Sequence, residues 1–191
     1  MTATHLQLRF VSSNHYKTVE VQEILAQQGI SVIPVELKIE ELQTTDTKKL
    51  VYDKLLKAFR EIGRPLFVEH TGLYVEGARE LPGGLTQIFW DALGPDAFAT
   101  LFGSLSSPSQ VIARTWIAYC DGRKILDFDG EIAGELVSPP RGPQHFQWDC
   151  VFQPDGMTQT FAELGQAKNT LSMRRIALDK FAEYLTANNP V

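Results

Sequence analysis

The 191-residue sequence has little cysteine and no long apolar segment. The two cysteines, Cys120 and Cys150, are far apart, which gives no zinc-ligand spacing and favours a reducing compartment. No apolar run approaches the ~18–20 residues that cross a bilayer, and the polar start does not resemble a signal peptide. We therefore expect a cytoplasmic protein that does not bind a membrane.

The sequence also lacks an excess of basic residues, with 18 Lys and Arg against 23 Asp and Glu and a formal net charge of −5. Binding of duplex DNA or RNA through a broad surface needs positive charge, so a nucleic-acid polymer is excluded as the partner. A small anion held by a local group of cations is not excluded. Internal repeats and low-complexity tracts are absent as well, so residues 1–191 are expected to form a single domain.

Strand and helix patterns alternate in the first third of the chain. Residues 6–11, 30–35 and 65–68 are typical of strands. Between them, apolar spacing predicts a helix that ends at Gly29 and another that begins at Thr45 or Asp46 and ends at Gly63. This order favours an α/β fold.

The later residues predict a different arrangement. Residues 81–84 are expected to form a loop and residues 95–102 a helix. Asp121 and Gly122 separate two β-rich runs, 111–119 and 124–132, which is a strong hairpin signal. A last helix follows near the C-terminus. We expect two lobes that share one sheet.

Two early segments carry polar residues next to predicted strands. Asn14 and Lys17 follow the first strand, where the N–H groups of a helix start attract phosphate, although such residues are more often only caps. Glu69 and His70 follow the strand at 65–68, in a predicted loop. Glu69 could bind Mg²⁺ and His70 could act as a general base, but the alternative is an ordinary surface turn, which is the more common explanation of an isolated histidine.

Two late segments combine aromatic and charged residues. Phe146, Trp148 and Asp149 could stack on a planar base and accept its N–H groups, or they could pack in a small core. Lys168 and Arg174 lie near the start of the last helix, where cations are unfavourable unless an anion is bound. A solvated helix face is the alternative interpretation.

Taken in order, these segments resemble the inosine triphosphate pyrophosphatase family, from residue 9 to about residue 185. The matching segments are Asn14-His15-Tyr16-Lys17 for N-x-x-K, Glu69-His70-Thr71-Gly72-Leu73 for E-D-T-G-L, Leu81-Pro82-Gly83, Phe146-Gln147-Trp148-Asp149 for F-G-W-D, Thr160-Phe161-Ala162-Glu163-Leu164, and Lys168-Asn169-Thr170-Leu171-Ser172-Met173-Arg174 for K-N-x-x-S-H-R.

The resemblance implies a two-lobed single domain around a long, twisted mixed β-sheet, with a nucleotide cleft between the lobes, and a homodimer. It implies a nucleoside triphosphate pyrophosphatase that uses Mg²⁺ to hydrolyse deaminated or modified purine triphosphates, of the ITP and XTP type, to the monophosphate and diphosphate. The implied substrate contacts are Ser12, Asn14, Lys17, Lys54, Thr71, Phe146, Trp148, Asp149, Lys168, Met173 and Arg174. The implied Mg²⁺ ligands are Glu41 (or its neighbour Glu40) and Glu69, and the implied catalytic residues are Glu69 and His70.

The chain departs from the family pattern at five positions. His70 replaces the catalytic Asp, Met173 replaces a His, Ser13 and Gln147 each replace a Gly, and Cys150 replaces a Pro. An imidazole can accept a proton but is a poor ligand for Mg²⁺. We therefore weigh an active pyrophosphatase with His70 as its base against a nucleotide-binding sensor or partner subunit that has lost hydrolysis. A purely structural or interaction domain is disfavoured, because the cations and aromatic residues of the family site remain.

Overall fold

The computed structural model describes residues 7–105 and 109–188, and the strands within these residues form one mixed sheet. They are β1 (Gln7–Val11), β2 (Ser31–Val35), β3 (Leu66–Val75), β4 (Pro82–Gly83), β5 (Gln110–Cys120), β6 (Ile125–Leu136) and β7 (Phe152–Pro154). The order across the sheet is β2-β1-β3-β5-β6-β7, and β4 pairs with β3. β1 is parallel to β2 and β3, whereas the other pairs are antiparallel. The expected α/β fold around a mixed sheet is confirmed.

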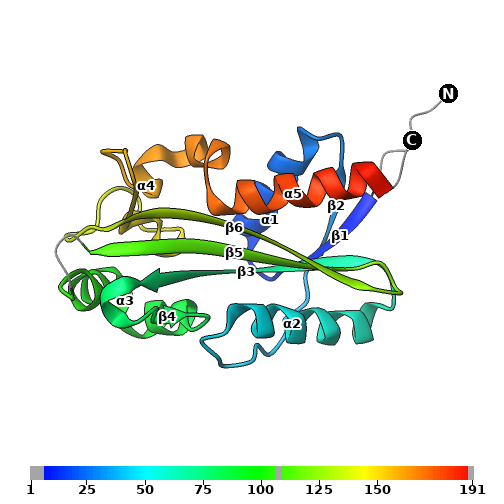
Figure 1. The fold of residues 1–191 in the computed structure, drawn as a ribbon, viewed down its shortest axis with the longest axis horizontal. Helices are drawn as coiled ribbons and strands as arrows, with labels where there is room; N and C mark the ends of the chain where they lie inside the picture. The colour runs from blue at the N-terminus through cyan, green and yellow to red at the C-terminus, as the bar shows by residue number, and fades with distance from the viewer. Residues whose placement is uncertain (1–6, 106–108, 189–191) are drawn as a thin grey trace.

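Helices cover both faces of this sheet. They are α1 (His15–Ala26), α2 (Thr47–Ile62), α3 (Thr86–Gly103), α4 (Phe161–Leu164) and α5 (Met173–Asn188), with short 3-10 turns η1 (Glu76–Ala78), η2 (Gln147–Cys150) and η3 (Gly165–Thr170). Figure 1 shows α1 and α5 on one face, α2 on the opposite face, and α3 and α4 near the other end of the long strands. None of the helices in the described ranges has both the length and the apolar character needed to span a bilayer.

The helix ends follow the predicted signals. The side chain of Asn14 accepts a hydrogen bond from the Lys17 N–H at 3.1 Å and caps α1. Asp46 caps α2 in the same way, through the Lys49 N–H at 3.0 Å. Gly63 ends α2 in the left-handed conformation, with φ of 63°, which a glycine adopts at low cost.

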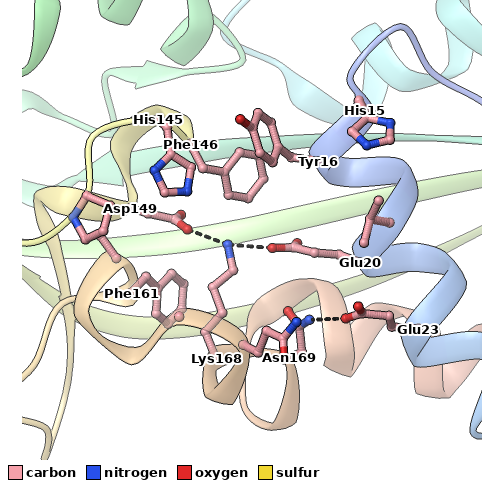
Figure 2. Close-up of a pocket in the computed structure, with 15 residues that line it drawn as sticks. His15, Tyr16, Glu20, Glu23, His145, Phe146, Asp149, Phe161, Lys168 and Asn169 are labelled. Carbon is pink, nitrogen blue, oxygen red and sulfur yellow. Dashed lines mark hydrogen bonds and ion pairs between the residues drawn. The ribbon is translucent and has the colours of Figure 1, made fainter.

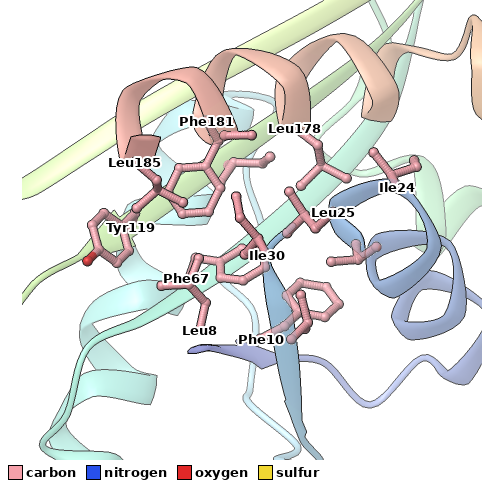
Figure 3. Packing of buried hydrophobic residues seen from close by; sticks show 14 of the residues in the cluster. Leu8, Phe10, Ile24, Leu25, Ile30, Phe67, Tyr119, Leu178, Phe181 and Leu185 are labelled. Atoms are coloured by element: carbon pink, nitrogen blue, oxygen red, sulfur yellow. The ribbon is translucent and has the colours of Figure 1, made fainter. Parts of the chain in front are cut away.

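Apolar packing is concentrated at the two ends of the shared sheet. Where α1 and α5 cover the sheet, the Phe67 ring lies 5.1 Å from Phe181 and 4.9 Å from Phe10 between centroids (Figure 3). A second cluster surrounds Phe98 and Phe152, beyond the end of β1. Each fully buried side chain of this size contributes about 1.5–3 kcal/mol. The long strands β3, β5 and β6 join the two lobes.

Three segments differ from the sequence expectation. The strand expected at 65–68 is β3, which continues to Val75, so that Glu69 and His70 lie inside a strand and not in a loop. The expected loop at 81–84 contains β4, and the helix expected at 95–102 is the second half of α3, which bends at Gly94 (φ 71°). The hairpin is confirmed, since β5 and β6 pair along their length on either side of Asp121 and Gly122.

Candidate active site

The site begins at a gap along one edge of β3. β1 pairs with this edge at Leu66 and Phe67, and β4 pairs with it at Leu73 and Tyr74. The opposite edge of β3 is paired with β5 throughout. Residues 68–72 therefore meet no described strand at the β1 edge, and cationic side chains from α1 and α2 reach them instead.

A cavity of about 390 Å³ lies between the start of α1, residues 143–149 and residues 161–169 (Figure 2). Aromatic side chains form one of its walls. The Phe146 ring packs against Tyr16 at 5.3 Å between centroids, and Tyr16 also contacts His145 at 5.7 Å. The Lys168 ammonium lies 4.0 Å from the centre of the Phe146 ring. The cavity thus combines a flat apolar surface with a cation, which suits a planar, electron-rich ligand.

Buried carboxylates face the same ammonium. Lys168 Nζ contacts Glu20 Oε1 at 2.6 Å and forms a shorter contact with Asp149 Oδ2 (Figure 2). Burial raises the pKa of Asp149 to about 6, against the attraction of Lys168, and the charge of Glu20 adds to the rise. An ammonium has three donors, so Lys168 can bind both carboxylates and still donate one hydrogen bond to a ligand.

The charge network continues from the cavity to β3. Arg174 Nη1 contacts Glu20, and Arg174 Nε donates to Glu69 Oε2 at 2.9 Å. Lys17 Nζ contacts the other oxygen, Glu69 Oε1, at 2.8 Å. Burial alone would raise the pKa of Glu69, but the charges of Arg174 and Lys17 hold it well below its ordinary value. Glu69 is thus an ionised carboxylate whose two oxygens are both engaged by cations.

His70 points to the other side of β3, away from Glu69, as neighbouring residues of a strand do. Its Nδ1 lies 3.5 Å from Glu41 Oε2, and Lys54 Nζ contacts Glu41 Oε1 at 2.6 Å. Among the described residues, the buried His70 Nε2 has no hydrogen-bond partner. Burial lowers the pKa of His70, so the ring is neutral at neutral pH. The arrangement is a carboxylate–imidazole pair with one free nitrogen.

Other residues singled out from the sequence have supporting places. The Ser12 hydroxyl accepts from the Asn14 N–H at 3.1 Å, which shapes the loop before α1. The Thr71 hydroxyl donates to Glu69 Oε2 at 3.2 Å. Trp148 and Met173 lie in the apolar cluster around Phe152 and do not line the cavity. Both are core residues, and their neighbours in the sequence, Asp149 and Arg174, form ion pairs near the cavity.

Sequence reasoning missed Glu20 and Tyr16. Glu20 lies three residues after Lys17 on α1, and this i, i+3 spacing on a helix that starts at a candidate phosphate loop could have indicated it. Tyr16, whose side chain is exposed, gives no pattern in the sequence that separates it from an ordinary surface residue.

Comparison with known proteins places these features in a family. Residues 8–184 match the model of the Ham1 family. The chain is 36% identical over 184 residues to the inosine triphosphate pyrophosphatase of Tuber melanosporum, covering 95% of this chain and 97% of that one. It is 32% identical over 186 residues to the dITP/XTP pyrophosphatase of Methanopyrus kandleri, covering 96% and 98%. Among solved structures, a HAM1 protein from Coxiella burnetii is similar, with a TM-score of 0.80, 26% identity, and coverage of 95% and 99%.

Proposed function

The chain belongs to the Ham1 family, and from this membership we propose that it hydrolyses deaminated purine nucleoside triphosphates, such as ITP, dITP and XTP, to the monophosphate and diphosphate. The observation that carries the proposal is the buried charge network. It connects a base-sized cavity at Asp149 and Lys168 to the cations beside β3, through Glu20 and Arg174.

Base recognition is assigned to the cavity. A 6-oxopurine stacked on Phe146 would present its 6-oxygen to the remaining donor of Lys168 and its N1–H to the carboxylate of Asp149. Adenine would present a donor to Lys168 and an acceptor to Asp149, which leaves buried polar groups unpaired. Arg174 is held between two carboxylates, so we assign it to positioning Glu20 and Glu69.

Phosphate binding is assigned to the loop before α1 and to the cations at the gap. The N–H groups of the first turn of α1, which have no acceptor within the helix, and the ammonium groups of Lys17 and Lys54 provide positive charge there. Ser12 and Asn14 support this loop with their side-chain oxygens. Their role is to hold the loop in a shape that can accept phosphate.

The chemical step is assigned to His70. The carboxylate of Glu41 faces Nδ1 and fixes the tautomer with a proton there, which leaves the lone pair of Nε2 free. A neutral imidazole of this kind can take a proton from the water that attacks the phosphate chain. Glu69, which is fully paired, stabilises the cations near the phosphates and does not itself accept the proton.

Enzymes of this family generally depend on a divalent metal ion. Within residues 7–105 and 109–188, no group of three or more His, Cys, Asp or Glu side chains is arranged to hold one. The oxygens of Glu69 are engaged, whereas Glu41 has a partly exposed carboxylate with lone pairs to spare. Glu41 could therefore hold a Mg²⁺ ion that binds together with the triphosphate, since Mg²⁺ often binds through one carboxylate and substrate phosphates. Such an ion would neutralise phosphate charge.

The test is direct. The protein would be incubated with Mg²⁺ and ITP, dITP, XTP, GTP or ATP, and diphosphate release would be followed. We expect turnover of ITP, dITP and XTP, and little turnover of ATP. Binding of ITP by calorimetry without turnover of any nucleotide would contradict the proposal and leave the non-hydrolysing sensor.

Two expectations accompany this function. The homodimer and the cytoplasmic location implied by the sequence stay predictions. Sedimentation of the purified protein tests the first, and imaging of the tagged protein in its own cells tests the second.

A further inference from the structure

Gln147 has a backbone conformation that favours glycine. It opens η2, between Phe146 of the cavity wall and Trp148, with φ of 45°. A glutamine is less stable than a glycine at this φ, and a contact of its side chain can offset part of that cost. Gln147 Nε2 donates a hydrogen bond to Oε1 of Gln87 on α3.

Gln87 is oriented to accept that bond. Its own Nε2 donates to Asp91 Oδ1 at 2.7 Å, one turn further along α3, which leaves Oε1 facing Gln147. The first turn of α3 is in turn fixed to β3. The hydroxyl of Thr86, the residue before Gln87, accepts from the Leu73 N–H at 2.8 Å and donates to the Gly83 carbonyl at 2.6 Å. Leu73 lies three residues after His70 in the same strand.

A connected path therefore runs from β3 through the start of α3 to the segment that carries Phe146 and Asp149. We propose that Gln87 and Gln147 form a positioning pair, which holds the base-binding segment in place relative to the strand that carries His70. This inference rests on the proposed function, because it assigns base binding to Phe146 and Asp149. Neither glutamine is a catalytic residue, and their effect is on how well the cavity is preorganised for the base.

The effect should appear in KM. Gln87→Met keeps the length of the side chain but removes the acceptor, so residues 146–149 are no longer held before the nucleotide arrives. The KM for ITP is expected to rise about threefold to tenfold, the loss typical of one hydrogen bond, while kcat changes little. Gln28→Ala is the matched control, since Gln28 is an exposed glutamine that also donates to an aspartate, Asp179.

A rescue variant separates the hydrogen bond from packing. Gln87→Glu retains the acceptor for Gln147 and is made in the Asp91→Asn background, so that the introduced carboxylate does not face a second carboxylate at residue 91. Its KM is expected to return to within about twofold of the Asp91→Asn parent. A KM as high as that of Gln87→Met would contradict the assignment of the bond.

A mutant cycle tests whether the two glutamines act together. Gln147→Gly relieves the backbone but removes the donor, so Gln87→Met should have almost no further effect on KM in that background. Independent, multiplicative effects of the two changes would overturn the proposal.

Hydrogen exchange of residues 143–151 without nucleotide gives a readout that does not need turnover. We expect faster exchange in Gln87→Met than in the wild type and in Gln28→Ala. If the protein hydrolyses no nucleotide but exchange is faster, the proposed function fails and the pair stands as a loop support. Unchanged exchange together with unchanged KM refutes the pair while leaving the function intact.

Discussion

Glu20→Gln is the sharpest perturbation of the proposed base site. Glu20 and Asp149 contact the same Lys168 ammonium, so each competes for its positive charge. The change keeps the shape of residue 20 but removes its negative charge. Lys168 then stabilises ionised Asp149 more strongly, and the pKa of Asp149, about 6 in the wild type, must fall.

The size of this shift follows from the geometry. Two carboxylates on one ammonium lie about 4–5 Å apart, where like charges repel by about 3–4 kcal/mol at an effective dielectric constant near 20. One pKa unit corresponds to about 1.4 kcal/mol. Even if relaxation removes half of the repulsion, the pKa of Asp149 falls by about one unit.

The assay is the affinity for ITP, measured by calorimetry as a function of pH, because kcat/KM would also report the titration of the general base His70. Asp149 must be ionised to accept the N1–H of the base, so the affinity should rise through a pKa of about 6 in the wild type. In Glu20→Gln this rise should move to lower pH by about one unit. Glu23→Gln removes the same charge one turn later on α1, where Glu23 contacts Asn169 and not Lys168, and should leave the rise in place. An unchanged pH profile in folded Glu20→Gln would refute the assignment of Asp149.

The same variant has a stability cost that must be kept apart from the pH effect. Glu20 is buried and paired with Lys168 and Arg174, and breaking such pairs costs about 3 kcal/mol. Lys168 keeps Asp149 as a partner, so the loss of stability is at the lower end of the roughly 3–5 kcal/mol that breaking a buried ion pair costs. For a domain of this size, Tm should fall by about 6–12 °C. ITP binding is therefore compared well below the lower Tm.

The remaining predictions address catalysis and packing. His70→Ala should reduce kcat about 10²- to 10⁴-fold without weakening ITP binding by calorimetry, and His70→Asp should keep activity; a His70→Ala variant as fast as the wild type would remove His70 from the mechanism. Gly130→Ala places a Cβ 2.2 Å from the Met173 carbonyl oxygen, so α5 must shift. We expect the free energy of unfolding in urea to fall by about 2 kcal/mol or more. An unchanged value would show that β6 can move to relieve the clash. Phe181→Ala should lower the free energy of unfolding by about 3–5 kcal/mol in the same assay but leave kcat/KM unchanged at low temperature. Loss of activity in the folded variant would show that this cluster supports the site.

Local signals in the sequence were sufficient for several elements. The caps Asn14 and Asp46, the left-handed Gly63 and the turn at Asp121 act through neighbouring backbone groups, so they could be predicted without the fold. β3 could not be bounded in the same way. Its polar run from Glu69 resembles a loop, and it is a strand because distant cations neutralise Glu69 and β5 pairs along its whole length.

The sequence alone determined the α/β class, the order of the motifs and the family that they resemble, because these depend on short-range spacing. The tertiary structure decided which residues meet. It joined Lys168, Glu20, Arg174 and Glu69 into one buried network and placed Met173 in the apolar core instead. It also paired His70 with Glu41 and left Nε2 free. Charges from α1, β3 and the C-terminal segment stabilise one another only when the fold buries them together, and no local pattern encodes that proximity.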